Sequence, residues 1–229
     1  MGPIFQSSFM VFLAGLLILT GCASKFDLKH GLKFNLNRLK DYSEIPVVRH
    51  LPSNSFLIND SSLAGALFGA IGNAGGSVLT LASAKTDGEA LSKKIGLEDP
   101  IVNVQKDFVS RLQEKLGSSR FRSVDKPPEG DSVEYFKKIY KSGMVLDFKT
   151  TGWGISSSAS SGYKVYYNAQ SRWINITDQK IDWTGDCRFE GKETTLELLQ
   201  QDNGSLLMLT LNEGTEACSF QLFSALLEK

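Results

Sequence analysis

The chain has 229 residues, of which 41% are hydrophobic, and its 25 Lys plus Arg balance its 25 Asp plus Glu. This hydrophobic content excludes a wholly disordered chain, and the length fits one ordinary domain with an appendage. Because a neutral chain has no global field that would attract polyanions, we expect no nucleic-acid partner.

The N-terminal segment contains an apolar run that is too short to cross a membrane. Residues 9–19 read FMVFLAGLLIL, whereas a spanning helix needs about 20 residues and the apolar part of a signal peptide about 7–15. The run leads into Leu19-Thr20-Gly21-Cys22, which resembles the lipobox of bacterial lipoproteins. This resemblance implies that residues 1–21 are a signal peptide that is removed and that Cys22 is acylated. Multiple acyl chains hold a protein stably on a bilayer.

Two neighbouring features bear on this prediction. The first eight residues, MGPIFQSS, contain no Lys or Arg. This departs from the lipoprotein pattern and leaves two alternatives open, an ordinary secretory leader with a chance cysteine and an uncleaved anchor. Ala23 follows the cysteine, and in Gram-negative lipoproteins an Asp at this position commonly signals retention in the inner membrane. We therefore expect a lipid-anchored, periplasm-facing protein, in the outer membrane rather than the inner one.

The remaining cysteines form an even pair. With Cys22 acylated, Cys187 and Cys218 are left in an oxidising compartment, where disulfides form and persist. Their spacing matches no zinc motif, so we predict a disulfide between them and expect neither a metal nor a cofactor. The bridge would close a loop of about 30 residues and stabilise the fold by roughly 3–4 kcal/mol. The alternative is two unpaired buried thiols.

Residues 22–50 are polar and mixed, which indicates a tether between the anchor and the domain. This stretch contains both histidines of the chain, His30 and His50, and we expect them to lie on the surface. Residues 55–59 follow as a short strand, and the single domain would occupy residues 51–229.

A glycine-rich segment, residues 61–84, contains no charged side chain. Gly65 and Gly69, like Gly72 and Gly76, have the GxxxG spacing that lets another backbone approach a helix closely. One interpretation is an interaction element for membrane contact or self-association. The alternative is a small-residue helix or loop packed against its own domain. Residues 85–96 are charged and contain Gly88 and Gly96, which indicates a loop.

From Asp99 onward the sequence predicts one secure helix, three strands and a C-terminal helix. Asp99-Pro100 opens a helix and Leu116-Gly117 ends it. Residues 144–155, 163–176 and 181–189 have the β-branched, aromatic and alternating pattern of strands. From Thr194 the pattern is helical, and a disulfide from Cys218 would fix the last helix to the sheet. We therefore predict an α+β fold, with an antiparallel sheet and helices on one face.

Residues 163–189, YKVYYNAQSRWINITDQKIDWTGDCRF, resemble a two-strand segment of uncharacterised Gram-negative lipoproteins. Together with the lipobox and the small domain, they resemble more distantly the periplasmic domain of CsgG-like and LpoB-like lipoproteins, over roughly residues 99–189. The resemblance implies a protein that assembles or activates partners without chemistry of its own. It assigns no functional residue to a position of this chain.

Catalytic motifs do not stand out in the sequence. It contains no G-x-S-x-G, HExxH or Walker loop, and the two histidines lie in the expected tether. Asp182 and Asp186 would share one strand face with Arg188, as a solvated surface. The aromatic residues of the strands are more often core than a glycan-binding surface; they are Trp153, Trp173, Trp183, Tyr163, Tyr166 and Tyr167.

Two functions of different classes fit these observations. The first is a non-enzymatic envelope accessory or assembly factor that acts through an envelope protein partner or through self-association. The second is a periplasmic ligand-binding or hydrolytic domain that acts on cell-wall or lipid material. A deep pocket with convergent polar groups would favour the second function, and a flat or helical apolar surface would favour the first.

Overall fold

The computed structural model of the chain describes residues 34–51, 55–59, 78–117, 120–158, 160 and 162–228, with side chains from residue 85 onward in the helix that begins at residue 78. Residues 1–21, Cys22 and the first part of the expected tether lie outside the described residues. The same is true of Gly65, Gly69, Gly72 and Gly76, so the anchor and the glycine-rich interaction element stay predictions.

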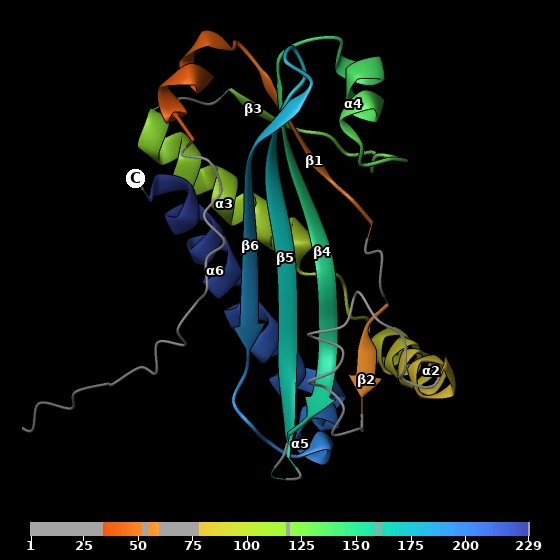
Figure 1. The fold of residues 1–229 in the computed structure, drawn as a ribbon. Coiled ribbons are helices and arrows are strands. Elements are labelled where there is room, and N and C mark those ends of the chain that lie inside the picture. Colours follow the sequence, from red (N-terminus) through yellow and green to blue (C-terminus); the bar gives the residue numbers. More distant parts are fainter. Residues whose placement is uncertain are drawn as a thin grey trace, which may run out of the picture.

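Helices and short strands precede a run of long strands (Figure 1). In chain order they are η1 (Leu36–Asp41), β1 (Ile45–Arg49), β2 (Leu57–Asn59), α2 (Val78–Ile95), α3 (Ile101–Leu116), β3 (Phe121–Ser123), α4 (Val133–Tyr140), β4 (Met144–Ser157), β5 (Tyr163–Asn175), β6 (Lys180–Glu190), α5 (Leu196–Gln200), η2 (Asp202–Gly204) and α6 (Ser205–Leu227).

The sheet is mixed, which corrects the prediction of a purely antiparallel one. Its strand order is β3-β1-β4-β5-β6, with β2 pairing a separate part of β4. The strands β1 and β3, β1 and β4, and β2 and β4 are parallel, whereas β4, β5 and β6 are antiparallel. The physical reason is the connections: α2 and α3 separate β1 from β3, and α4 separates β3 from β4. A helical crossover returns the chain parallel to the strand it left.

Part of the stretch expected as a tether belongs to the folded domain. Residues 36–41 form η1, and residues 45–49 form β1, which lies between β3 and β4 in the sheet. Leu39, Ile45 and Val47 are fully buried. Residues 34–50 therefore contribute to the core.

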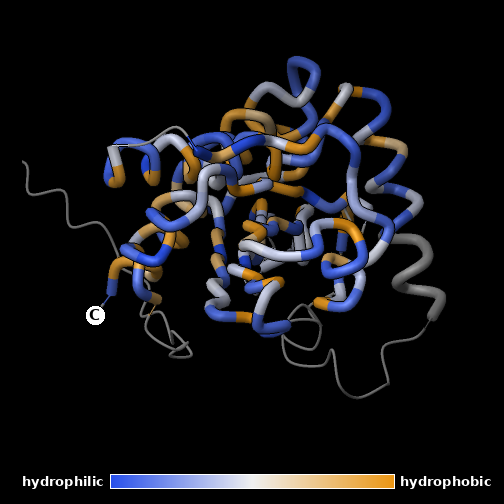
Figure 2. Tube along the Cα trace, turned by 90° about the horizontal axis from the view of Figure 1, so that it is seen from above, coloured by the Kyte–Doolittle hydropathy of each residue, from blue (hydrophilic) through white to orange (hydrophobic). Residues whose placement is uncertain are grey.

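Helices cover both faces of the sheet, which corrects the prediction that they lie on one. Figure 1 shows α3 and α6 behind the long strands, where the larger apolar core forms around Phe108, Phe148 and Trp173. The shorter helix α4 packs on the opposite face, around Phe136 and Ile174. Seen from above, hydrophobic positions gather toward the middle of the molecule, while most hydrophilic positions lie around it (Figure 2).

The segment predicted as a loop at residues 85–96 is helical almost throughout. Helix α2 continues to Ile95, and only Gly96, with φ of 66°, ends it. Gly88 lies inside the helix, and a side chain there would overlap the carbonyl group of Phe56, just before β2. The glycine therefore permits close packing of α2 against the β2 segment and does not interrupt the helix.

The predicted helix after Asp99-Pro100 is confirmed. Asp99 accepts a hydrogen bond from the Ile101 amide at 3.0 Å, and Gly117 ends α3 in the left-handed conformation. At the other end of the chain, Cys187 of β6 and Cys218 of α6 form the predicted disulfide, with Cα atoms 5.2 Å apart. Both cysteines are buried, so the bridge joins the C-terminal helix to the sheet inside the core.

Candidate functional site

The aromatic residues of the strands form core and not an open binding surface. Trp173 and Tyr167 are fully buried, and Trp153 and Trp183 are at most 5% exposed. Phe34 stacks on Trp173 with ring centroids 5.2 Å apart. The possibility of a glycan-binding surface is therefore wrong for the rings of Trp173, Tyr167 and Trp183, whereas Trp153 lines a cleft.

The two aspartates of β6 do not share a site. A bulge in the pairing of β5 with β6, next to Trp173 and Ile174, breaks the alternation of side chains. Asp182 lies against Arg38 at 3.1 Å, near η1, whereas Asp186 accepts a hydrogen bond from Gln170 at 2.8 Å. The prediction that both lie on one face failed because a bulge adds one residue to one strand only.

His50 lies in a partly buried charged cluster, which corrects its prediction as a surface tether residue. Its Nε2 is 2.6 Å from Asp147 Oδ1. Arg172 contacts the other oxygen of the same carboxylate through Nε, at 2.7 Å, and through a terminal nitrogen. The side chains of His50, Asp147 and Arg172 are only 13%, 1% and 10% exposed.

This cluster fastens the segment before α4 to the sheet. Arg172 also donates to the carbonyl oxygen of Asp131 at 3.0 Å, and Lys149 donates to the Asp131 carboxylate at 3.3 Å. Burial raises the pKa of Asp131, but the hydrogen bond and charge of Lys149, together with the charge of Arg172, hold that pKa below its ordinary value. Since Arg172 bonds both to the Asp147 carboxylate and to the Asp131 backbone, these contacts support a structural role.

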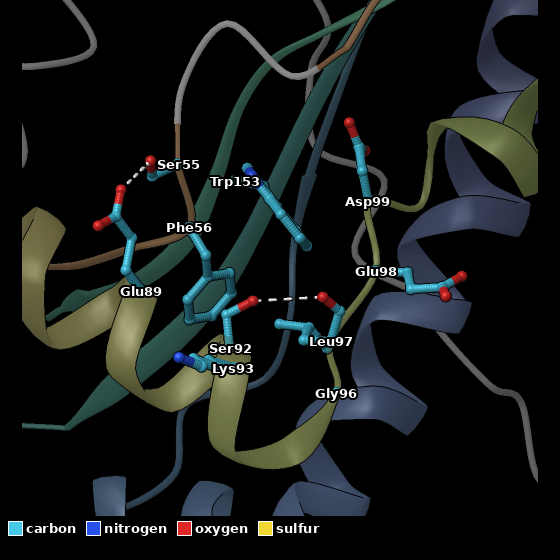
Figure 3. Close-up of a pocket in the computed structure, with 10 residues that line it drawn as sticks. All are labelled: Ser55, Phe56, Glu89, Ser92, Lys93, Gly96, Leu97, Glu98, Asp99 and Trp153. Carbon is cyan, nitrogen blue, oxygen red and sulfur yellow. Dashed lines mark hydrogen bonds between the residues drawn. The ribbon is translucent and has the colours of Figure 1, made fainter.

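A cleft of about 490 Å³ opens between α2, the β2 segment and the start of α3 (Figure 3). The rings of Phe56 and Trp153 meet at one side of it, with centroids 5.2 Å apart. The residues that line it are Ser55, Phe56, Glu89, Ser92, Lys93, Gly96, Leu97, Glu98, Asp99 and Trp153. The cleft thus combines an apolar wall with carboxylates and one ammonium group.

Asp99 is a partly buried acid at the margin of this cleft. Its Oδ1 accepts a hydrogen bond from the Thr150 hydroxyl at 2.6 Å, and burial raises its pKa above the ordinary value. In Figure 3 the carboxylate points away from Phe56 and Leu97. The cleft therefore holds a buried acid at its margin, without convergence of the polar groups. In the described part of the chain, no group of three His, Cys, Asp or Glu side chains could hold a metal ion.

The outward side of α6 exposes large apolar side chains. Leu209 is 56% exposed and Phe220 is 58% exposed, and Met208 lies beside Leu209. The Arg111 guanidinium of α3 lies 5.9 Å from the centre of the Phe220 ring. We call Met208, Leu209 and Phe220 the α6 surface. Exposed Asn212, Glu213 and Glu216 lie between Leu209 and Phe220 along the helix, so the apolar side chains are spaced along α6 and do not form one continuous patch.

The sequence analysis did not single out the α6 surface. The signal was present, because residues 205–227 read SLLMLTLNEGTEACSFQLFSALL, with more apolar side chains than one face of a helix buries. Within the described part of the chain, no helix is both long and apolar enough to cross a bilayer.

No protein-family model matches the sequence, and no curated protein matches it significantly. Several solved structures resemble the chain at low identity. The protein XCC0632 from Xanthomonas campestris, of family DUF330, is 12% identical, with 80% of this chain and 86% of that one covered and a TM-score of 0.36. Lipoprotein GNA1162 from Neisseria meningitidis is 14% identical, with 75% and 99% covered and a TM-score of 0.25.

The C-terminal domain of LpoB from Salmonella enterica is also among the similar structures. It is 9% identical, with 67% of this chain and 91% of that one covered and a TM-score of 0.21. All three TM-scores are below the level that indicates a common fold. The likeness therefore assigns neither a family nor a function to this chain.

Proposed function

We propose that this chain is a lipoprotein of the bacterial envelope, anchored through Cys22, and that it acts without chemistry of its own as an accessory or assembly factor. The contact with an envelope protein would be made by the α6 surface. The observation that carries this proposal is the exposure of Leu209 and Phe220 on the outward side of α6, at 56% and 58%. A partner that covered both side chains would remove their apolar area from water, which favours binding.

The chain length before the domain limits where such a partner could lie. Phe34, the first described residue, follows Cys22 by twelve positions. A fully extended chain reaches at most about 3.3–3.6 Å per residue, so Phe34 would lie within roughly 40 Å of the anchored membrane. A protein bound to the α6 surface would then be a membrane protein or another protein held near the bilayer.

Site-specific photocrosslinking tests this proposal. A photoactivatable side chain at Leu209 should give one defined crosslinked species in membranes, and Cys22→Ser should abolish it by removing the anchor. Ile139 of α4 is a matched control because it is 49% exposed on a different helix. Equal yields from Leu209 and Ile139, or no species from either, would contradict the proposed contact surface.

The cleft supports a second candidate function, ligand binding or hydrolysis on cell-wall or lipid material. The observation in its favour is that the rings of Phe56 and Trp153 and the partly buried carboxyl of Asp99, whose pKa burial raises, line the same cleft. Intrinsic tryptophan fluorescence can test it, because soluble cell-wall fragments bound in the cleft should change the emission of Trp153. If saturating fragments change the emission of the wild type and of Trp153→Phe equally, the cleft is not their binding site.

A further inference from the structure

Strand β6 is the last strand of the sheet and carries an unusual contact along its outer edge. In the described part of the chain, β5 is its only neighbouring strand. From α6, the Gln221 side chain accepts a hydrogen bond from the Arg188 amide and donates one to the Arg188 carbonyl oxygen, both at 3.2 Å. This carboxamide therefore occupies the place of a neighbouring strand, but at one residue only.

The contact identifies which backbone groups of β6 point outward. Because the direction of backbone polar groups alternates along a strand, those of Thr184, Asp186 and Glu190 point the same way as those of Arg188. The side chains of Asp186, Arg188 and Glu190 are exposed, and at Arg188 the carboxamide of Gln221 occupies the edge. Unpaired edge groups of this kind are a template for another strand.

We propose that a second copy of this chain pairs antiparallel with the β6 edge and forms a symmetric dimer. The argument for a second copy is charge complementarity. In the register that places Asp186 opposite Arg188 of the second copy, symmetry creates the same ion pair twice, and Thr184 lies opposite Glu190. Opposite charges across neighbouring strands stabilise the pairing.

Shifting the second strand by two residues keeps the outward backbone groups facing each other, but it makes the charge pairing less favourable. A shift by two residues in one direction places Asp186 opposite Asp186 of the second copy, and a shift in the other direction places Arg188 opposite Arg188. Like charges directly opposite each other destabilise a strand pair. Arg188 forms no ion pair with any described residue, so its charge is available for the one register with opposite charges.

Gln221 competes with the second copy in this arrangement. When the edges pair, the Arg188 amide and carbonyl exchange the carboxamide of Gln221 for backbone groups of the partner, so the number of hydrogen bonds at Arg188 does not fall. Dimerisation uses the β6 edge and needs neither the lipid anchor nor the α6 surface. The inference therefore goes beyond the proposed function, and either can fail alone.

Charge reversal tests both the dimer and its register. The full-length protein, extracted in mild detergent, is measured by analytical ultracentrifugation over a range of concentrations. Asp186→Arg places Arg opposite Arg, and Arg188→Asp places Asp opposite Asp. Each variant alone should dimerise more weakly by about tenfold or more, because two ion pairs are replaced by two repulsions. Melting temperatures close to that of the wild type would show that the variants are folded.

A mixture of the two variants tests the register most directly. A heterodimer of Asp186→Arg with Arg188→Asp restores opposite charges at both positions, so the 1:1 mixture should dimerise as strongly as the wild type. Gln221→Ala should strengthen wild-type dimerisation severalfold by removing the competing carboxamide. A wild-type protein that is monomeric at all concentrations, or a mixture that dimerises no better than the separate variants, would overturn the inference.

Discussion

His50 Nε2 lies 2.6 Å from Asp147 Oδ1, and Arg172 contacts the other oxygen of that carboxylate. Asp147 is 1% exposed, so its removal leaves a nearly buried guanidinium without its partner. Asp147→Ala should therefore destabilise the fold by about 3–5 kcal/mol. Urea unfolding measures this loss, with Asp125→Ala, at an exposed aspartate, as the control. A loss no larger than that of the control would show that the cluster is not structural.

Gly88 of α2 provides a second test. Because a side chain there would overlap the backbone of Phe56, Gly88→Ala should lower the free energy of unfolding by about 1–3 kcal/mol, although alanine is the better helix former. Asp87→Ala, at the exposed neighbouring position, should leave stability nearly unchanged. An increase in stability for Gly88→Ala would mean that α2 does not pack closely against the β2 segment.

The disulfide between Cys187 and Cys218 closes a loop with a sequence separation of 31. Replacing both cysteines by serine should lower the free energy of unfolding by roughly 3–4 kcal/mol, since the unfolded chain gains conformational entropy. Peptide mapping without reductant should recover the linked pair from the wild type. Two alkylatable thiols in the folded protein would contradict the bridge.

The pH dependence of stability tests the environment of Asp99. Burial raises its pKa above 3.8, so between these two values the folded state binds more protons than the unfolded state. The contribution of Asp99 is therefore fully present below about pH 4 and is lost as the pH rises through the raised pKa. Asp99→Asn should remove this decline, and Glu98→Gln, at an exposed neighbour, should not. Identical pH profiles for Asp99→Asn and the wild type would exclude the shift.

Local signals predicted the elements of the second half of the chain, and long-range pairing decided the rest. Asp99 and Gly117 bound a helix through local residue preferences at helix ends. The even pair Cys187 and Cys218 predicts a disulfide by itself. Gly88 was interpreted as a loop residue because its sequence does not show that Phe56 lies against it. In the same way, the partner of His50 is Asp147, and no short-range pattern joins two residues that only the β1–β4 pairing brings together.

For the candidate surfaces too, the sequence shows local composition but not long-range packing. The apolar excess of α6 is visible in its sequence, but which side chains remain exposed depends on how α6 lies against α3 and the sheet. The bulge next to Trp173 likewise separates Asp182 from Asp186, which strict alternation would place together. The lipobox at Cys22 is a local pattern and lies outside the described residues, so its role stays a prediction.

Mass spectrometry of the intact protein from native membranes tests the central claim most directly. The account predicts a mature chain that begins at Cys22 and carries diacylglycerol and an N-acyl chain on that residue, with the remaining two cysteines linked. A chain that retains residues 1–21, or one in which the Cys22 thiol is free, would contradict the lipid anchor and the function proposed from it.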